Sequence, residues 1–315
     1  MRSWCALMLS ASLALPAGAG PEAGPANGPR FGFARPEYGR ELLTRRDDFV
    51  QRLSPFDRAA RLKTGQAVSE AEYLAFVAGS VLEWPAAEKD LLLGALARIQ
   101  APLAALQLPW PERIALIRTN GREEGSAPYT RAEAIVLPGR VFAQPQELEH
   151  LLLHELFHIL TRRNPALKAR LYGAIGFVPC AEPVLPPPLA ALKITNPDAP
   201  ANDFCIRLQH GPAQIQAVPI LYATGPYDPA RGGEFFDYLR LGFVPVAGPQ
   251  QEAPHFELLA PEALDGFYQQ VGRNTGYILH PEEILADNFA LLLQGETSVP
   301  SPEVLARIQA VLTGH

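Results

Sequence analysis

The pentapeptide His154-Glu155-Leu156-Phe157-His158 constrains this chain more than any other segment. It has the form HExxH, and its flanks are apolar. Residues four apart share one face of a helix, so both imidazoles can bind the same metal ion. Glu155 then lies close enough to act on a water molecule beside that ion. Two histidine ligands leave room for a third protein ligand and a water, which is typical of a catalytic zinc site.

The residues around this motif predict a helix. Pro145 suits a first helical turn, Arg162 and Arg163 suit a last turn, and Asn164-Pro165 stops the helix. His150 lies one turn before His154 but about 80° around the helix from His158, so we expect it beside the site or at the surface. The alternative interpretation is a buried helix whose histidines hydrogen-bond to carboxylates or backbone without a metal.

A second predicted helix supplies acidic residues. Pro281 suits its first turn, and Gly295 marks its end. Glu283 and Asp287 are four apart and share a face. Glu283 can act as the third metal ligand, and Asp287 can accept the free ring N–H of a ligand histidine. The alternative is an exposed acidic start of a helix.

HExxH on one helix and ExxxD on a later one resemble the gluzincin metallopeptidases, the thermolysin-like branch of the zincins. The resemblance implies Zn²⁺ bound by His154, His158 and Glu283, with Glu155 as general base and Asp287 supporting a ligand histidine. It covers two short helices. The chain has no GxMEN segment. An Asn-Glu pair often opens the thermolysin-type glutamate helix, but here the residue before Glu283 is Glu282.

This resemblance implies an α+β, zincin-like fold and the hydrolysis of peptide bonds by a zinc-activated water. The substrate would be a peptide or protein. A phenol or imidazole must stabilise the developing oxyanion, and Tyr277 and His280 are the candidates, with Tyr268 a weaker third. Two other classes stay open: a non-catalytic zincin-fold protein for binding or assembly in the cell envelope, and a structural protein without metal.

The first residues predict export. Arg2 precedes an apolar run from Trp4 to Leu15, and Ala17-Gly18-Ala19 fits a cleavage site. We expect a signal peptide over residues 1–19, a secreted or periplasmic protein, and no stable membrane insertion after cleavage. The formal net charge is −6, without basic clusters, so nothing favours a nucleic-acid partner.

Cys180 and Cys205 are the two cysteines that such cleavage would leave. In an oxidising compartment an even pair can form a disulfide, and these two lie in a proline-rich region that would gain from one. We therefore predict a bridge between them. Neither cysteine belongs to a CxxC motif, so a cysteine-based zinc site is disfavoured.

The rest of the chain divides by pattern into a leader, a helical region, a sheet edge and an insert. Residues 20–36 read as a flexible leader and residues 37–110 as helical. Within the helical region we expect helices over 41–53, from Ser69 with a capping box to Glu72, and over 86–106.

The remaining parts carry the motifs. Residues 111–165 contain two predicted strands, 113–118 and 134–137, joined as a hairpin through Asn120-Gly121 and placed beside the HExxH helix. Residues 166–276 read as an irregular β- and loop-rich insert, and residues 277–315 as the glutamate helix and a C-terminal helix. His210 and His255 lie in the insert, and neither has a partner at ligand spacing.

Overall fold

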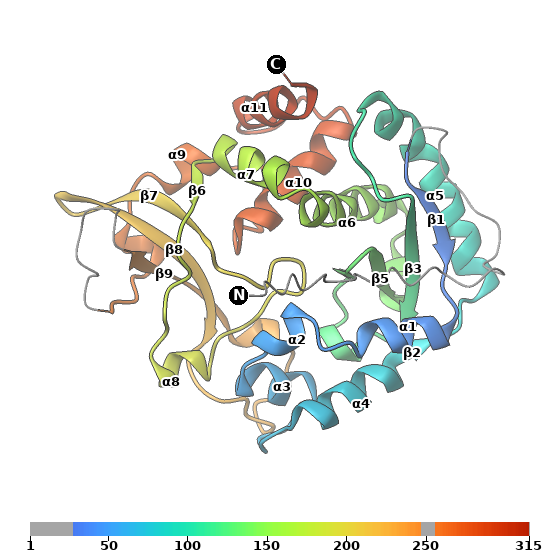
Figure 1. The fold of residues 1–315 in the computed structure, drawn as a ribbon, viewed down its shortest axis with the longest axis horizontal. Helices are drawn as coiled ribbons and strands as arrows, with labels where there is room; N and C mark the ends of the chain where they lie inside the picture. The colour runs from blue at the N-terminus through green and yellow to red at the C-terminus, as the bar shows by residue number, and fades with distance from the viewer. Residues whose placement is uncertain (1–27, 247–255, 315) are drawn as a thin grey trace, which may run out of the picture.

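The computed structural model describes residues 28–246 and 256–314, which form a mixed α+β fold (Figure 1). Two small sheets lie on opposite sides of the molecule, and helices α6 and α10 run between them. The predicted signal peptide and His255 lie outside the described residues. Within the described ranges, no helix is both long enough and apolar enough to cross a membrane.

The first sheet has a largely parallel core. Strands β1 (Arg30–Phe33), β3 (Arg113–Thr119) and β5 (Ala134–Pro138) are parallel neighbours, in the order β1-β3-β5. Strand β4 (Tyr129–Arg131) pairs antiparallel with β5 and forms one edge, while β2 (Val81–Leu82) pairs with β3. All of β5 is buried, as expected for a strand covered on both faces.

Two expectations for this sheet are wrong. The flexible leader was expected to reach residue 36, but Phe31 and Phe33 are buried in β1, which gives the segment a place in the sheet. The hairpin between β3 and β5 is not formed, because these strands run parallel. Their connection, residues 120–133, is long enough to return the chain, and the hairpin is instead β4–β5, with Ala132 at φ 50°.

The N-terminal helices are α1 (Pro36–Leu43), α2 (Asp48–Arg52), α3 (Pro55–Arg61), α4 (Glu70–Ser80) and α5 (Ala86–Ala105). The single helix expected over 41–53 is split, because the Asp47 side chain accepts a hydrogen bond from Val50 N at 3.1 Å and starts a new helix. The capping box of Ser69 and Glu72 is present, and α5 matches its predicted range.

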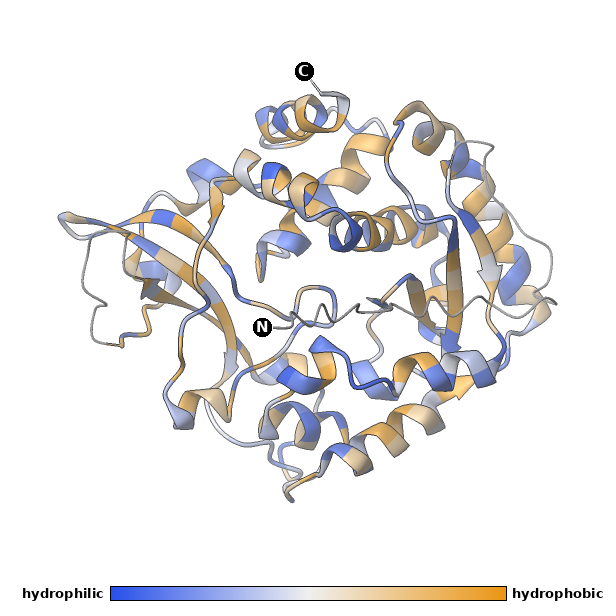
Figure 2. Ribbon diagram, viewed as in Figure 1, coloured by the Kyte–Doolittle hydropathy of each residue, from blue (hydrophilic) through white to orange (hydrophobic). Residues whose placement is uncertain are grey.

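The two motif helices form the centre of the molecule. Helix α6 (Leu148–Arg163) follows the 3₁₀ turns η2 (Gly139–Ala143) and η3 (Pro145–Glu147) and ends at Asn164. Helix α10 (Pro281–Leu293) packs along it, with the rings of Phe157 and Phe289 5.5 Å apart. Figure 2 shows hydrophobic residues along both helices. Both rings are fully buried, so truncating either to alanine would cost about 3–5 kcal/mol.

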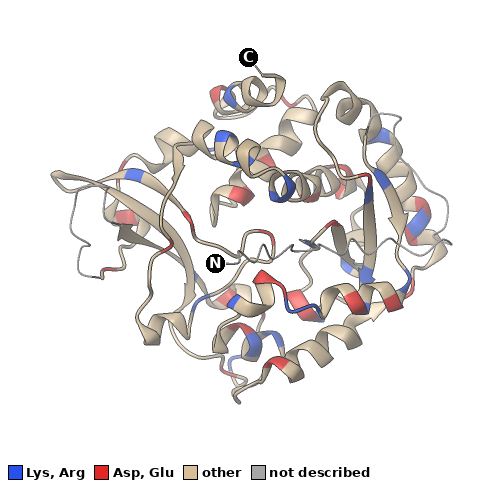
Figure 3. Cartoon of the chain, viewed as in Figure 1, with Lys and Arg blue, Asp and Glu red and all other residues tan. Residues whose placement is uncertain are grey.

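The insert is more regular than expected. It contains an antiparallel sheet, ordered β6 (Phe177–Pro179), β7 (Phe204–His210), β8 (Ala213–Ala223) and β9 (Leu239–Val246). Figure 3 shows few charged residues on this sheet and both signs interspersed over the N-terminal helices. The remaining elements are α7 (Pro165–Ala174), α8 (Pro187–Ala190), η1 (Arg122–Glu124), η4 (Phe235–Tyr238), η5 (Pro261–Ala263), α9 (Phe267–Val271) and α11 (Pro302–Thr313).

The predicted disulfide is not formed in this structure, because Cys180 and Cys205 are both free. They are nevertheless neighbours. Cys205 pairs with Val178 across β6 and β7, and Cys180 N donates to Asp203 O at 2.9 Å. A hydrogen bond between the two thiols raises the pKa of Cys180 and lowers that of Cys205.

Candidate metal centre

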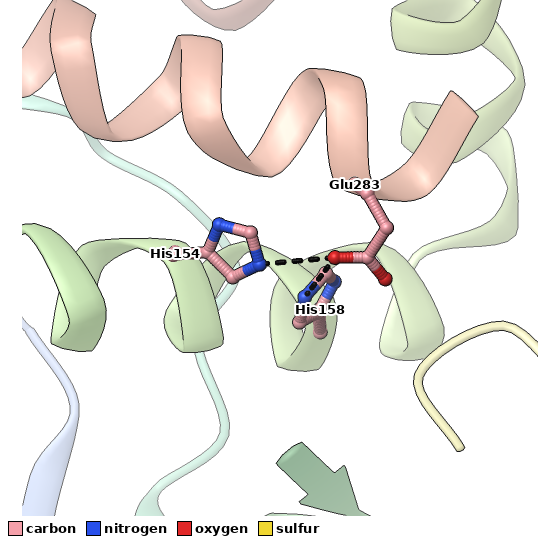
Figure 4. A group of neighbouring side chains, drawn as sticks. All are labelled: His154, His158 and Glu283. Atoms are coloured by element: carbon pink, nitrogen blue, oxygen red, sulfur yellow. Dashed lines mark hydrogen bonds and ion pairs between the residues drawn. The ribbon is translucent and has the colours of Figure 1, made fainter. Parts of the chain in front are cut away.

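Helices α6 and α10 bring the three predicted ligands together (Figure 4). His154 and His158 project from α6 toward Glu283 of α10. Glu283 Oε2 lies 3.1 Å from His154 Nε2 and 3.6 Å from His158 Nε2. The two imidazole rings are 4.7 Å apart and nearly perpendicular. One nitrogen of each ring and one carboxylate oxygen therefore surround a common point.

Each histidine is held by a carboxylate on its other nitrogen. His154 Nδ1 donates to Asp287 Oδ1 at 2.8 Å, which is the hydrogen bond expected from the sequence. His158 Nδ1 donates to Glu282 Oε1 at 3.2 Å. With Nδ1 protonated and bonded, each Nε2 keeps its lone pair for a metal ion. The same arrangement therefore occurs at both histidines: a carboxylate bonds Nδ1 and leaves Nε2 available to a metal ion.

The role of Glu282 was not predicted. The sequence shows it only as a second acid at the start of α10, and no spacing rule points to His158. Its carboxylate is fully buried and also accepts hydrogen bonds from Thr161 and from Tyr172 Oη at 2.5 Å. Burial alone would raise the pKa of Glu282, but the cation of Lys168 and the bond from His158 lower it to about 2.

Asp287 and Glu283 are themselves fixed by neighbours. Thr275 Oγ1 donates to Asp287, and Asn196 Nδ2 donates to Glu283 Oε1 at 2.6 Å. Asn196 belongs to the insert, so a segment far from α10 in sequence orients the third ligand. Its contribution could not be found from the sequence, because Asn196 lies in a loop without a ligand spacing.

Glu155 faces the same centre. It is 2% exposed, and its Oε2 atom is buried without a hydrogen-bond partner among the described residues. Burial and repulsion from Asp198 raise the pKa of Glu155 to about 8. A buried carboxylate oxygen that lacks a partner is costly, so its persistence here points to a ligand, a water or a substrate group that it would contact.

The charge of the centre favours a cation. Five carboxylates converge on its histidines: Glu155, Asp198, Glu282, Glu283 and Asp287. Burial alone would lower the pKa of His158, yet Asp198 and Glu283 raise it to about 9. Such a field attracts either a proton or a metal ion. The nitrogen and oxygen donors fit zinc, which binds histidine and carboxylate together.

A second group of possible ligand atoms lies beside the first. Atoms of Glu155, His158 and Asp198 are within 4.8 Å of one another, as are those of His154, His158 and Glu283. The second set has only one imidazole and uses Glu155, whereas the first has two imidazoles that are both oriented by carboxylates. The first set is therefore the better candidate for a metal site.

A cavity of about 350 Å³ opens onto this centre. Its lining includes His154, Glu155, Glu283 and Tyr277. The Tyr277 ring centre is 6.3 Å from that of His154. Partial burial, with added repulsion from Glu283, raises the pKa of Tyr277 well above its usual value, so its phenol stays protonated and can donate a hydrogen bond.

His280 does not reach the cavity. It is the N-cap of α10, and its Nδ1 accepts a hydrogen bond from Glu282 N at 3.1 Å. Burial lowers the pKa of His280 to about 4, which keeps the ring neutral and able to accept. The expectation that His280 stabilises an oxyanion is therefore wrong, because the ring is used to cap the helix.

The other candidate residues lie outside the ligand set. Tyr268 lines a different cavity, formed with Phe243 and Arg273. His150 bonds Gln294 at 2.8 Å and lies 3.6 Å from Asp287, beside the site as expected. His210 ends strand β7, away from both groups of ligand atoms.

Comparisons of the chain with protein-family models, with curated proteins and with solved structures gave no match.

Proposed function

We propose that the chain is a zinc-dependent peptidase with a zincin-like catalytic centre. One observation carries the proposal: His154 and His158 direct Nε2 at Glu283 while Asp287 and Glu282 hold their Nδ1 atoms. A buried helix with structural histidines needs no such double arrangement.

His154, His158 and Glu283 would hold the zinc ion. When bound, zinc supplies a Lewis acid that favours both a nucleophilic water and a polarised substrate carbonyl. Glu155 accepts the proton of the attacking water on its unpartnered oxygen and delivers it to the leaving amine. Tyr277 donates a hydrogen bond to the substrate oxygen as negative charge develops there.

Glu155 favours an enzyme over a non-catalytic zincin. A binding or assembly protein has no use for a buried carboxylate with an unpartnered oxygen beside two ligand histidines. In an enzyme that oxygen contacts the reacting water. A buried carboxylate with a raised pKa at that point suits general-base chemistry.

Hydrolysis of a peptide library by zinc-loaded protein tests the proposal. We expect cleavage that a chelator abolishes and that zinc restores. Glu155→Gln is the inactive variant, and Glu149→Gln is its control, because Glu149 lies on the same helix but bonds Arg98 at the surface. Cleavage that persists in a chelator, or a chain that binds no zinc, would refute the proposal.

We also propose export of the chain, on the strength of Arg2, the apolar run and Ala17-Gly18-Ala19. Sequencing the N-terminus of the mature protein tests this proposal. We expect it to begin at Gly20 or within a few positions of it, whereas an intact Met1 in the exported fraction would contradict it.

A further inference from the structure

Asp198 stands at the boundary between two hollows along strand β4. The cavity at the metal centre includes Pro128, before that strand, and a larger hollow of about 630 Å³ includes Ala132, after it. Among the residues that the structure describes, Asp198 is the one that lines both. Its side chain is 8% exposed. The segment that carries it, residues 195–200, is called the strap below.

The strap is bonded across the edge strand. Asp198 Oδ1 accepts hydrogen bonds from Thr130 N at 2.7 Å and from Thr130 Oγ1 at 2.5 Å. Thr130 is the middle residue of β4. A peptide that ran the full length of this edge would need the same N–H group. Asp198 therefore blocks this strand edge at Thr130.

Several hydrogen bonds hold the strap in place. Thr195 N donates to both carboxylate oxygens of the buried Asp57 at 3.1 Å. Arg162 donates to Asp198 O at 3.2 Å, and Asn196 bonds both Glu283 and the backbone of Asp198. Displacing the strap would leave buried polar groups without partners and release the third ligand. It behaves as a fixed wall, which argues against a lid.

Asp198 places a carboxylate close to the reacting atoms, and Oδ1 of that carboxylate lies 3.7 Å from the Arg162 guanidinium. A carboxylate oxygen of Asp198 lies within 4.8 Å of ligand atoms of both Glu155 and His158. Thr130 occupies Oδ1, so Oδ2 is left to accept a hydrogen bond from a substrate. The unpartnered Oε2 of Glu155 borders the same space. A carboxylate acceptor at this position suits an ammonium group and repels a carboxylate.

We propose that Asp198 binds the free α-amino group of the substrate, so that the site removes residues from peptide N-termini. The inference rests on the proposed peptidase function and names its substrate class. The α-nitrogen of a peptide is two bonds from its first carbonyl carbon. An ammonium held by Asp198 therefore places the first peptide bond at the metal centre, beside Glu155 and Tyr277. Asp198 acts by positioning the substrate.

Binding of two small probes to zinc-loaded protein tests this without turnover. Leucine hydroxamate carries a metal-binding group and a free amine, whereas N-acetyl-leucine hydroxamate carries the same group without the charge. We expect calorimetry to give about 10–100-fold tighter binding of the free amine, as for one charge-assisted hydrogen bond. Asp198→Asn keeps the acceptor for Thr130 and should remove this preference.

Asp203→Asn is the matched control, because Asp203 lies near the strap and lines only the larger hollow. It should keep the preference. Equal binding of both probes to the natural protein, or an unchanged preference in Asp198→Asn, would overturn the inference. Loss of zinc in Asp198→Asn would also overturn it and would make Asp198 a metal ligand.

Mapping of cleavage products separates this inference from the function on which it rests. Stepwise loss of N-terminal residues from free peptides, with acetylated peptides left intact, supports both. Internal cleavage of acetylated peptides would overturn the role of Asp198 and keep the peptidase. A natural protein that binds no zinc would overturn both.

Discussion

His158 donates from Nδ1 to Glu282 Oε1 at 3.2 Å, and both side chains are buried. Glu282 directly precedes the proposed third ligand. One turn of α10 thus supplies both a ligand and the group that orients another ligand, while Asp287, one turn later, orients His154. Two carboxylates of the facing helix α10 therefore orient the two histidines of the HExxH helix.

Glu282→Gln should weaken zinc binding about 10–100-fold, because glutamine no longer offers the charged acceptor that fixes the His158 ring. Asp287→Asn should have a similar effect through His154. Competition with a chromogenic chelator measures both affinities. Glu303→Gln, at the exposed start of α11, is the control. Unchanged affinity in Glu282→Gln would mean that Glu282 only stabilises the fold.

The protein should bind one zinc ion per chain through His154, His158 and Glu283. His154→Ala and His158→Ala should abolish binding, and Glu283→Gln should weaken it. Since zinc would bind the folded state, its addition should raise the Tm and a chelator should lower it. Elemental analysis and thermal denaturation check this. His210→Ala is the control, and a zinc content well below one in the natural protein would refute the assignment.

Glu155→Gln should retain zinc and lose hydrolysis by about 10²–10⁴-fold, because the amide cannot take the proton of the attacking water. Kinetics on a cleavable peptide, with zinc content measured in the same sample, check this. Near-normal turnover in the variant would place the general base elsewhere, and Asp198 would be the nearest alternative carboxylate.

The sequence predicted the two motif helices well because their signals are local. Asn164 and Pro281 act on their own turns, and helical periodicity places His154 with His158 and Glu283 with Asp287. Pro145, expected in the first turn of the HExxH helix, instead begins the 3₁₀ turn η3 just before α6. The spacing of Glu283 and Asp287 and the family resemblance suggested a ligand role for Glu283, but no local rule places α10 against α6.

Long-range pairing was beyond the sequence. The chain turns at Asn120-Gly121, but the direction of β5 relative to β3 depends on the tertiary pairing of the strands. The two strands are parallel, so the expected β3–β5 hairpin was wrong. The roles of Glu282, Asn196 and Asp198 likewise depend on the packing of α10 and the insert against α6. His280 was misassigned because a histidine just before a helix can be either an N-cap or an oxyanion donor, and the sequence does not distinguish the two.

Oxidation should join Cys180 and Cys205, whose thiols already share a hydrogen bond. The bridge would close a loop of 24 intervening residues (205 − 180 − 1) and stabilise the fold by about 3 kcal/mol, mainly through the unfolded state. A non-reducing digest should show one linked peptide pair, and Cys180→Ser should remove the stability gain. Two free thiols after mild oxidation would contradict this prediction.

Tyr277→Phe should lower kcat by about 10²–10³-fold with little change in KM, because the phenol would act on charge that develops only in the transition state. Tyr277 lines the same cavity as Glu283, and its protonated state suits a donor. Tyr268→Phe is a matched control, since Tyr268 is equally exposed, at 38% against 39%, but lines another cavity. A change in KM alone would instead make Tyr277 a substrate-packing residue. An unchanged kcat would leave the oxyanion to another group in the cavity, since His280 is committed to capping α10.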